Sequence, residues 1–456
     1  MNRKIIKALV ALVDFALLNV ALLLVLTFRY GFDGLGSQWL RHFPVFGLIG
    51  LLWLLDFYIA DIYNITQKLD YRRFLVCMAI NVGLAIAIFY LLSGIPIAPK
   101  TNLGLITALY VVFFLAWRIL LERFMNQYGI RRPVVFIGLD TYSLKLAEKL
   151  AGNPRLGYAI DGFVIGAAAR TPETLPAWLG AGPIKLMNTM EELSVFLEER
   201  SIHSLVVSEE WYHEVHQQLY RFFPTGVRMF QLSTFWELVE ETIPVHAADE
   251  LWFLQNLSRG PYSVYHKLKR FFDLLTSVLF LPLILLFCML TFLLVRATSK
   301  GPAIYRQTRV GLGNRNFTIY KFRSMRLDAE TNGAVWASEK DPRLTPVGEF
   351  IRRYRLDELP QIFNVLKGDM SIIGPRPERP EFVDKLAHDI PHYNLRHLVK
   401  PGLTGWAQVK YRYGASVEDS EVKLMYDLFY VKNVSSMLDL KIALKTILTV
   451  ISKGGR

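Results

Sequence analysis

The sequence predicts a membrane protein that combines α-helices with α/β structure. We expect a four-helix transmembrane bundle, a Rossmann-like α/β middle domain and an α+β C-terminal domain with a re-entrant membrane helix. Three observations predict this: four apolar stretches open the chain, alternating strand and helix patterns follow, and a fifth apolar stretch precedes a polar, motif-rich segment. A chain of 456 residues also exceeds one ordinary domain, which favours two or three units.

The composition agrees with membrane insertion. Apolar residues make up 52% of the chain, and charged residues still reach 20%, so soluble parts are expected beside embedded ones. The net charge of +12 suits nucleic acid or the basic cytoplasmic face of a membrane protein. Because no nucleic-acid motif accompanies the charge, we expect no nucleic-acid partner. Cys77 and Cys288 lie in apolar runs and are interpreted as buried thiols rather than a disulfide or metal pair.

Residues 1–125 are predicted to form the transmembrane bundle. Its four apolar stretches are each long enough to cross a bilayer as a helix: residues 6–28, 43–63, 75–97 and 103–122. Basic residues precede the first stretch, separate the second from the third and follow the fourth, which places both ends of the bundle in the cytoplasm. No small-residue cleavage site follows Leu26, so the first stretch is interpreted as a retained anchor rather than a signal peptide. Asp14 and Asn19 are expected to face other helices, as bundle contacts or as functional groups.

Residues 131–245 are predicted to form the Rossmann-like domain. Its expected elements are three strands and two helices: strands at 134–138, 159–164 and 204–207, and helices at 143–150 and 190–200. The glycine fingerprint is incomplete, because Leu139, Asp140 and Thr141 follow Gly138 where further glycines would let a pyrophosphate approach. The pattern therefore indicates a degenerate nucleotide-binding domain. A structural or regulatory role and nucleotide binding both stay open, and residues 246–265 are predicted to be a linker.

The C-terminal domain is predicted to span residues 266–456 and to begin with a re-entrant helix at 268–296. Lysines and arginines flank this apolar stretch on both sides, whereas a spanning helix has one charge-poor end. Pro282 lies in the middle, where it removes a helical hydrogen bond and favours a kink. A helix that bends at Pro282 and leaves the membrane on the side it entered fits both facts. A plain fifth span is the alternative.

Two adjacent carboxylates are the strongest chemical signal. Pro360 is tolerated only in the first turn of a helix, so a helix should begin at about Asp357. Asp357 and Glu358 would then lie at a helix N-terminus, where the dipole favours ionised carboxylates. The plainer interpretation is that Asp357 is an ordinary helix cap. Cations exceed what a cap requires: Lys321, Arg323, Arg352, Arg353, Arg355 and Arg376.

These residue types together indicate phosphate-transfer chemistry. An ionised carboxylate can attack phosphorus and form an acyl phosphate, which splits one transfer into two steps. Its neighbour can hold Mg²⁺, which binds through one or two carboxylates plus substrate phosphates. Arg376, between Pro375 and Pro377, would present a planar fork to a diphosphate.

The motifs are ordered as in a known family. They are the segments 321–325, 341–345, 356–361, 364–371, 374–377, 400–405 and 430–433. Residues 266–456 resemble the monotopic polyprenol-phosphate phosphoglycosyl transferases of bacterial polysaccharide synthesis. The apolar start and the degenerate middle domain resemble the large subgroup, which includes the initiating sugar transferases of O-antigen and exopolysaccharide assembly. The stretch 411–419 looks most like the exopolysaccharide members.

The resemblance implies a two-step reaction on the cytoplasmic face of the bacterial inner membrane. Asp357 would attack a UDP-sugar, with glucose or galactose as the leading sugars, release UMP and keep the phosphosugar. Undecaprenyl phosphate would then accept the phosphosugar. The resemblance assigns Mg²⁺ to Glu358 and the re-entrant break to Pro282. The substrate-binding candidates are Lys321, Arg323, Arg352, Gln361 and Arg376. A homodimer is a further expectation.

Two other functions remain as alternatives at this point. An NAD-dependent sugar-modifying enzyme would need an intact glycine fingerprint in the middle domain, which residues 139–141 do not supply. A non-enzymatic scaffold or regulator of polysaccharide export would explain the apolar helices and the charge. It leaves the surroundings of Asp357 and Glu358 unexplained.

Overall fold

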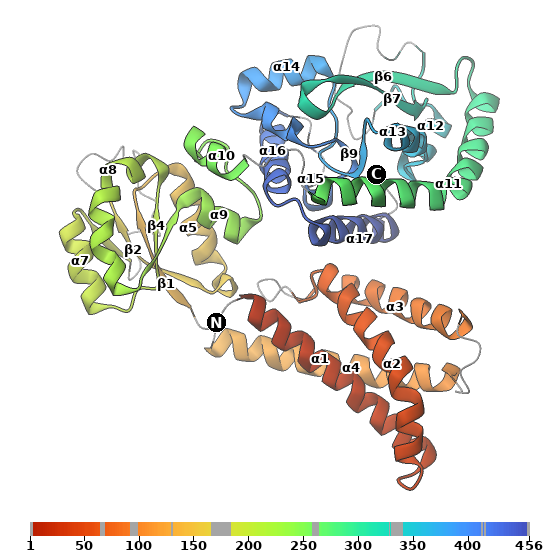
Figure 1. The fold of residues 1–456 in the computed structure, drawn as a ribbon, viewed down its shortest axis with the longest axis horizontal. Helices are drawn as coiled ribbons and strands as arrows, with labels where there is room; N and C mark the ends of the chain where they lie inside the picture. The colour runs from red at the N-terminus through yellow and green to blue at the C-terminus, as the bar shows by residue number, and fades with distance from the viewer. Residues whose placement is uncertain are drawn as a thin grey trace. The chain divides into compact units, whose positions relative to one another are not determined.

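A computed structural model describes residues 3–63, 69–91, 99–128, 131–165, 184–257, 264–327, 329, 341–411, 414 and 416–453 (Figure 1). The chain divides into two compact units. The first comprises Met1–Arg132 and Lys149–Ala159, and the second comprises Pro133–Glu148 and Ile160–Arg456. The predicted stretch 411–419 lies partly outside the described residues.

Four long apolar helices make up most of the first unit: α1 (Arg3–Tyr30), α2 (Leu35–Ile59), α3 (Tyr71–Leu91) and α4 (Pro99–Tyr128). All four are long and apolar enough to cross a membrane, which confirms the predicted apolar helices. Helix α1 packs on α2 and α4, and α3 also packs on α2 and α4. Asp14 is buried and lies 3.0 Å from Arg118 of α4, so it does face another helix. Asn19 instead donates to the carbonyl of Phe15 in its own helix.

The middle domain contains a five-stranded sheet in the order β3-β2-β1-β4-β5. Its strands are β1 (Arg132–Ile137), β2 (Tyr158–Val164), β3 (Lys185–Met187), β4 (Ser204–Val207) and β5 (Arg228–Gln231). The pairs β1–β4, β2–β3 and β4–β5 are parallel, and the order is that of a Rossmann fold. The three predicted strands and two predicted helices are therefore confirmed, with shifts of a few residues at their ends.

Helices cover both faces of this sheet (Figure 1). They are α5 (Thr141–Gly152), α7 (Met190–Glu199), α8 (Glu209–Leu219) and α9 (Leu232–Glu240). Two 3₁₀-helices, η1 (Pro154–Leu156) and η2 (Tyr220–Thr225), follow α5 and α8 in the chain. Leucine and phenylalanine side chains of α7 and α8 pack with Val135, Ile137, Leu205 and Val207 in one core cluster. Phe235 of α9 meets Phe136 from the opposite side, with ring centroids 6.4 Å apart.

The segment predicted as a linker contains helix α10 (Glu250–Leu257). Trp252 and Phe253 are buried in a cluster with residues of the C-terminal domain, among them Leu386 and Leu428. Helix α9 meets the same domain through charged contacts. Glu237 lies 2.6 Å from Lys432, and Glu241 lies 2.8 Å from Lys410. Most of the middle domain therefore belongs to the same compact unit as the C-terminal domain.

The C-terminal domain is built around a hairpin of β6 (Ile304–Val310) and β7 (Asn316–Phe322), which pair antiparallel. A parallel pair, β8 (Ser371–Ile373) and β9 (Gly402–Thr404), lies elsewhere in the domain. The shorter helices are η3 (Leu312–Asn314), α12 (Pro346–Arg353), η4 (Leu356–Gln361), α13 (Ile362–Lys367), α14 (Pro380–Asp389), η5 (Tyr393–Leu398) and α15 (Trp406–Lys410). Helices α16 (Val417–Lys432) and α17 (Ser436–Lys453) complete it.

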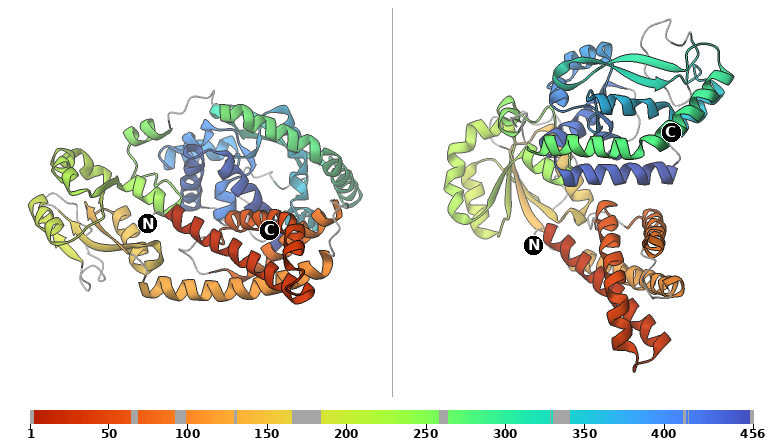
Figure 2. Two further views of the ribbon diagram at one scale, coloured as in Figure 1. Left: turned by 60° about the horizontal axis from the view of Figure 1, so that its bottom comes forward. Right: turned by 45° about the vertical axis from the view of Figure 1, so that its right-hand side comes forward.

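Helix α11 (Val264–Thr298) begins the C-terminal domain and contains Pro282. Figures 1 and 2 show it changing direction along its length, and a proline is the usual cause of such a bend. Its apolar side chains Leu279, Leu283 and Leu293 are each more than half exposed. It is the fifth helix in the described residues that is long and apolar enough to cross a membrane. The predicted bend is present, and the re-entrant path stays a prediction.

Candidate active site

The chain changes direction sharply just before the two carboxylates. Helix α12 ends at Arg353, and Arg355 adopts φ 54°, a left-handed conformation that is uncommon for a residue with a side chain. The 3₁₀-helix η4 then begins at Leu356 with Asp357 and Glu358 in its first turn. This agrees within one residue with the start predicted from Pro360. Because Arg355 occupies the cap position, the interpretation of Asp357 as an ordinary helix cap is wrong.

Glu358 lies among three cations. Nη2 of Arg376 lies 2.5 Å from Oε1 of Glu358, and Nη1 lies 3.5 Å from Oε2, so the guanidinium grips the carboxylate with both arms. Nζ of Lys321, from β7, lies 3.6 Å from Oε1, and Nη1 of Arg355 lies 3.9 Å from Oε2. Burial acts to raise the pKa of Glu358, but the charges of Arg376 and Lys321 outweigh it and hold the pKa well below its usual range. Glu358 is therefore ionised.

Asp357 precedes Glu358 directly in the sequence, but its contacts and the shift of its pKa are different. Its side chain is buried, and none of the hydrogen bonds or ion pairs found among the described residues engages its carboxylate. Burial and the neighbouring charge of Glu358 raise its pKa to about 6, against the attraction of Lys321, Arg352 and Arg376. At neutral pH this carboxylate is mostly ionised, and an ionised carboxylate is the form that can act as a nucleophile.

The structure brings most of the predicted substrate-binding residues to this place. Lys321 and Arg376 contact Glu358, and Arg352 is near enough for its charge to lower the pKa of Asp357. Burial lowers the pKa of Lys321 itself to about 8. Gln361 is buried on η4, and its Nε2 has no hydrogen-bond partner among the described residues.

Arg323 lies apart from this group. Its Nη2 donates to the carbonyl of Ser299 at 3.3 Å and to the Ser299 hydroxyl at 2.7 Å. Nη1 would lie 2.5 Å from a Cβ placed on Gly301, which adopts φ +101°. Arg323 therefore braces the turn after α11 in this structure, and its role as a substrate contact stays a prediction.

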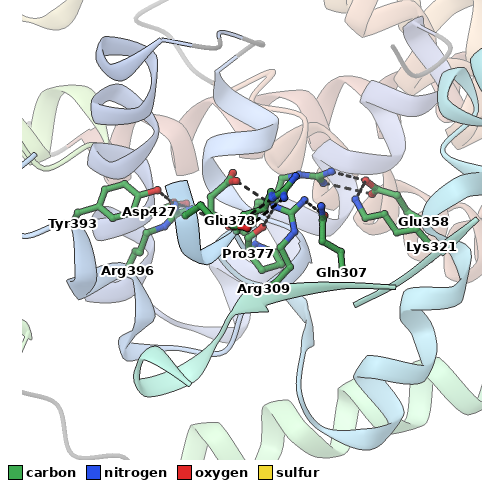
Figure 3. A network of polar contacts seen from close by, with 12 residues as sticks. Gln307, Arg309, Lys321, Glu358, Pro377, Glu378, Tyr393, Arg396 and Asp427 are labelled. Carbon is green, nitrogen blue, oxygen red and sulfur yellow. Dashed lines mark hydrogen bonds and ion pairs between the residues drawn. The ribbon is translucent and has the colours of Figure 1, made fainter. Parts of the chain in front are cut away.

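Arg376 belongs to a loop that is held along its backbone. Four successive carbonyls, from Pro375 to Glu378, each accept a hydrogen bond from another part of the domain. The donors are Gly402 N to Pro375 O at 2.9 Å, Arg396 Nη2 to Arg376 O at 2.9 Å, Arg309 Nη1 to Pro377 O at 3.1 Å, and Val310 N to Glu378 O at 2.9 Å. Figure 3 shows part of this network, with Arg309, Pro377 and Glu378 near its centre, Glu358 and Lys321 at one end, and Tyr393, Arg396 and Asp427 at the other.

Sequence reasoning missed the supports behind this loop. Arg309, Arg396 and Asp427 come from β6, η5 and α16, and no spacing in the sequence links them. The one available signal was the Tyr- and Arg-containing turn between His392 and His397, which holds both Tyr393 and Arg396. Only the structure shows that the guanidinium of Arg396, from this turn, reaches the backbone of the loop that contains Arg376.

The two carboxylates supply the oxygen ligands that a magnesium ion needs, although both oxygens of Glu358 contact Arg376 in this structure. Mg²⁺ prefers oxygen ligands and is usually held by one or two carboxylates together with substrate phosphates and water. Asp357 and Glu358 supply adjacent carboxylates. No cluster of three or more His, Cys, Asp or Glu side chains in the described part of the chain could hold a metal. An ion at Glu358 would therefore depend on phosphate oxygens of the substrate.

Comparisons with known proteins agree with this chemistry. The bacterial sugar transferase family matches residues 264–453. A UDP-glucose:undecaprenyl-phosphate glucose-1-phosphate transferase of Xanthomonas campestris is 32% identical over 361 residues, which cover 75% of this chain and 72% of that protein. The corresponding enzyme of Escherichia coli is 42% identical over 182 residues, covering 40% of this chain and 39% of that protein.

A third relative carries a different sugar in its name. The UDP-N-acetylgalactosamine-undecaprenyl-phosphate N-acetylgalactosaminephosphotransferase of Aeromonas hydrophila is 48% identical over 195 residues, which cover 43% of this chain. The match spans 46% of that relative, so this chain covers about half of its length.

The five apolar helices and the family comparisons together indicate a membrane-associated transferase. The chain belongs to the bacterial sugar transferases, the polyprenol-phosphate phosphoglycosyl transferase family that its motifs resemble. A non-enzymatic scaffold finds no counterpart among these three relatives, which are all named as transferases.

Proposed function

We propose that this enzyme transfers a sugar-1-phosphate from a UDP-sugar to undecaprenyl phosphate, as the first step of exopolysaccharide or O-antigen assembly. One observation carries the proposal. Two neighbouring carboxylates differ in their contacts: Arg376 and Lys321 hold Glu358, whereas no hydrogen bond or ion pair among the described residues engages the buried Asp357. A nucleophile beside a cation-rich phosphate site is what a two-step phosphosugar transfer needs.

In the first step, an oxygen of Asp357 attacks the phosphorus that bears the sugar. The bond from this phosphorus to the bridging oxygen breaks, and UMP leaves with that oxygen. The guanidinium of Arg376 and the ammonium of Lys321, which contact Glu358 in the free enzyme, are placed to take the charge of the diphosphate. Bound Mg²⁺, held by Glu358, would neutralise phosphate charge.

In the second step, a phosphate oxygen of undecaprenyl phosphate attacks the aspartyl phosphosugar. The acyl–phosphate bond breaks, which restores the carboxylate of Asp357 and gives a diphosphate-linked lipid. Only one carboxylate changes its covalent state over the cycle, and Glu358 remains ionised because its cations keep its pKa low.

The sugar is the least determined part of the proposal. The sequence resemblance favours glucose or galactose, whereas the names of the three relatives contain glucose and N-acetylgalactosamine. The donor panel must therefore contain the UDP derivatives of all three. Binding energy from sugar hydroxyls decides among them, because a site built to bond a hydroxyl rejects donors that lack it.

The shape of α11 supports a re-entrant path with the active site at the cytoplasmic face. Near its start, Asp273 accepts from Ser371 Oγ at 2.8 Å and from Ile372 N at 3.1 Å. Near its end, Val295 packs with Phe322 and Ile351. Both ends of α11 are thus attached to one folded domain, which favours one side of the membrane for both.

The test of the reaction is UMP release by the full-length protein with Mg²⁺, undecaprenyl phosphate and each UDP-sugar in turn. We expect release with one donor and its loss in Asp357→Asn. Asp384→Asn, an exposed aspartate on α14, is the matched control and should behave as wild type. No release with any donor from folded wild-type protein would refute the proposed reaction.

The re-entrant path is tested by cysteine labelling in spheroplasts, with Cys77 and Cys288 replaced by serine. We expect cysteines at Lys267 and Lys300 to resist a membrane-impermeant maleimide until the cells are permeabilised. A cysteine at Asp33, in the turn between α1 and α2, should react from outside. Labelling of only one of the first two from outside would show a plain fifth span.

A further inference from the structure

Arg376 owes its position to a buried ion pair outside the active site. We propose that Arg396 and Asp427 are positioning residues that hold the backbone of Arg376, so that its guanidinium is presented to the diphosphate of the donor. The proposal rests on the proposed function for its substrate. It adds two residues that touch neither Asp357 nor Glu358 in the contacts described above.

The backbone of the loop around Arg376 is held by hydrogen bonds from outside the loop. Pro375 and Pro377 fix the φ angles on either side of Arg376 and lack N–H groups, so the loop has few donors of its own. Its carbonyls accept from the surrounding domain instead, and the carbonyl of Arg376 accepts from Nη2 of Arg396 at 2.9 Å. This bond attaches the backbone of the residue whose side chain grips Glu358.

Arg396, the donor of this hydrogen bond, is buried. Arg396 is 6% exposed, and its Nη1 donates to the hydroxyl of Tyr393 at 2.5 Å. A buried guanidinium needs a counter-charge, because an uncompensated buried charge is strongly unfavourable. Asp427, 1% exposed on α16, supplies it with Oδ2 at 2.7 Å from Nη2 of Arg396.

The guanidinium of Arg396 contacts three groups that lie in different directions. Nη2 donates to the carbonyl of Arg376 and lies within ion-pair distance of Asp427. Nη1 donates to the hydroxyl of Tyr393 (Figure 3). The planar guanidinium of arginine has donors that point toward all three groups at once. The ammonium of lysine is a compact point charge and lacks this geometry. Lysine at this position would keep the charge and lose the alignment, so the side chain of Arg376 would move relative to Asp357.

A change at Arg396 should affect the UDP-sugar through the position of Arg376, because Arg396 holds the backbone of Arg376. A shift of about 1 Å in a substrate-positioning group can reduce a rate by about 100-fold. We expect Arg396→Lys to lower kcat/KM for the UDP-sugar by up to about this factor, chiefly by raising KM. Asp427→Asn should act in the same direction, since it leaves Arg396 without its counter-charge.

A double-mutant cycle of UMP release in the full-length enzyme tests the proposal. The variants are Arg396→Lys, Arg376→Ala and the two combined. In the Arg376→Ala background we expect Arg396→Lys to have no further effect on kcat/KM. Arg270→Lys is the matched control, because Arg270 also donates to backbone carbonyls, at Val365 and Leu366, away from the loop. Effects that multiply in the double variant, or an equal rise in KM in the control, would overturn the proposal.

A binding measurement keeps this test separate from the reaction itself. Calorimetric titration with UDP, a diphosphate that needs no turnover, should show weaker binding in Arg396→Lys than in Arg270→Lys at a similar melting temperature. If the wild-type protein binds UDP but releases no UMP, the proposed reaction fails. The double-mutant cycle of Arg396→Lys and Arg376→Ala is then measured as UDP affinity, and this result decides the positioning role. Wild-type protein that releases UMP but does not bind UDP would overturn the positioning proposal and leave the reaction standing.

Discussion

The middle domain and the C-terminal domain both contain carboxylates at a place where a phosphate could bind. The surroundings of these carboxylates differ between the two domains. In the middle domain, the helix that follows β1 begins at an aspartate: Asp140 Oδ1 accepts from Ser143 N at 2.6 Å. A carboxylate thus already takes an amide that a pyrophosphate would use in a Rossmann domain. Gly138 adopts φ +94°, and a Cβ there would lie 2.4 Å from Ser208 Oγ and 2.9 Å from Trp211. The side chains of these two residues fill the space beside the turn.

The pKa values express the same difference. Burial raises the pKa of Asp140, and it raises that of Glu209, at the start of α8, to about 7, with no lysine or arginine among the causes that shift either one. In the C-terminal domain, cations keep the pKa of Glu358 low despite its burial. Among the described residues, lysine and arginine charges therefore shift the pKa of Glu358 but are not among the causes that shift the pKa of Asp140 or Glu209. The same fold can host different functions, so we argue function from the site.

The largest effect that would test this comparison is removal of the metal. We expect EDTA to reduce UMP release to the background level, because the charge of the diphosphate would lose the ion that Glu358 is proposed to hold. Added Mg²⁺ in excess should restore it, and the melting temperature should not change. Full activity in EDTA would remove the metal role from Glu358.

The second test exchanges one carboxylate in each region. Glu358→Gln should lower kcat by at least about 100-fold, because it removes a proposed metal ligand and the partner of Arg376. Glu209→Gln keeps an acceptor for Ser233 N, which now bonds Glu209 at 2.8 Å, and should leave UMP release unchanged. Equal losses in both variants, measured at matched melting temperature, would contradict the separation of the two regions.

A smaller and graded effect is expected from pH. Asp357 acts as a nucleophile only when ionised, and its pKa is raised to about 6, so kcat/KM should fall as the pH drops below 6. Lys321 binds phosphate only when protonated, and its pKa is lowered to about 8, so kcat/KM should also fall as the pH rises above 8.

The variant Lys321→Arg separates these two limbs. Arginine stays protonated throughout this range, so the basic limb should move beyond the measured pH values while the acidic limb stays in place. A basic limb that does not move would assign it to another group.

Much of this site was predictable because prolines leave a local signal. Pro360 placed the start of the carboxylate-bearing helix within one residue, and Pro282 predicted the bend in α11. Both predictions depend on the missing N–H and the fixed φ angle of proline, which act within one turn of chain. The left-handed residue Arg355, by contrast, has no such signal, and the turn it makes could be found only in the structure.

The partners of charged residues were not predictable in this way. Lys269 and Arg270 were interpreted as membrane-flanking charges, yet Lys269 lies 2.6 Å from Asp439 and Arg270 caps the end of α13. Arg323 was grouped with the substrate-binding cations and lies against Ser299. A sequence gives the number and sign of charges, while their partners depend on segments that meet only after folding.

The smallest expected effect comes from the middle domain itself. Asp140→Asn keeps a side-chain acceptor for Ser143 N and removes a charge that burial disfavours, so stability should change by less than about 1 kcal/mol. UMP release should equal that of wild type, and titration with NADH should show no binding in either protein. A loss of activity in Asp140→Asn would mean that the edge of the sheet influences the catalytic domain, for which α9 offers a route through the ion pairs of Glu237 and Glu241. Binding of NADH would show that the carboxylate at the start of α5 does not exclude a pyrophosphate, and the contrast between the two regions would then rest on the catalytic site alone.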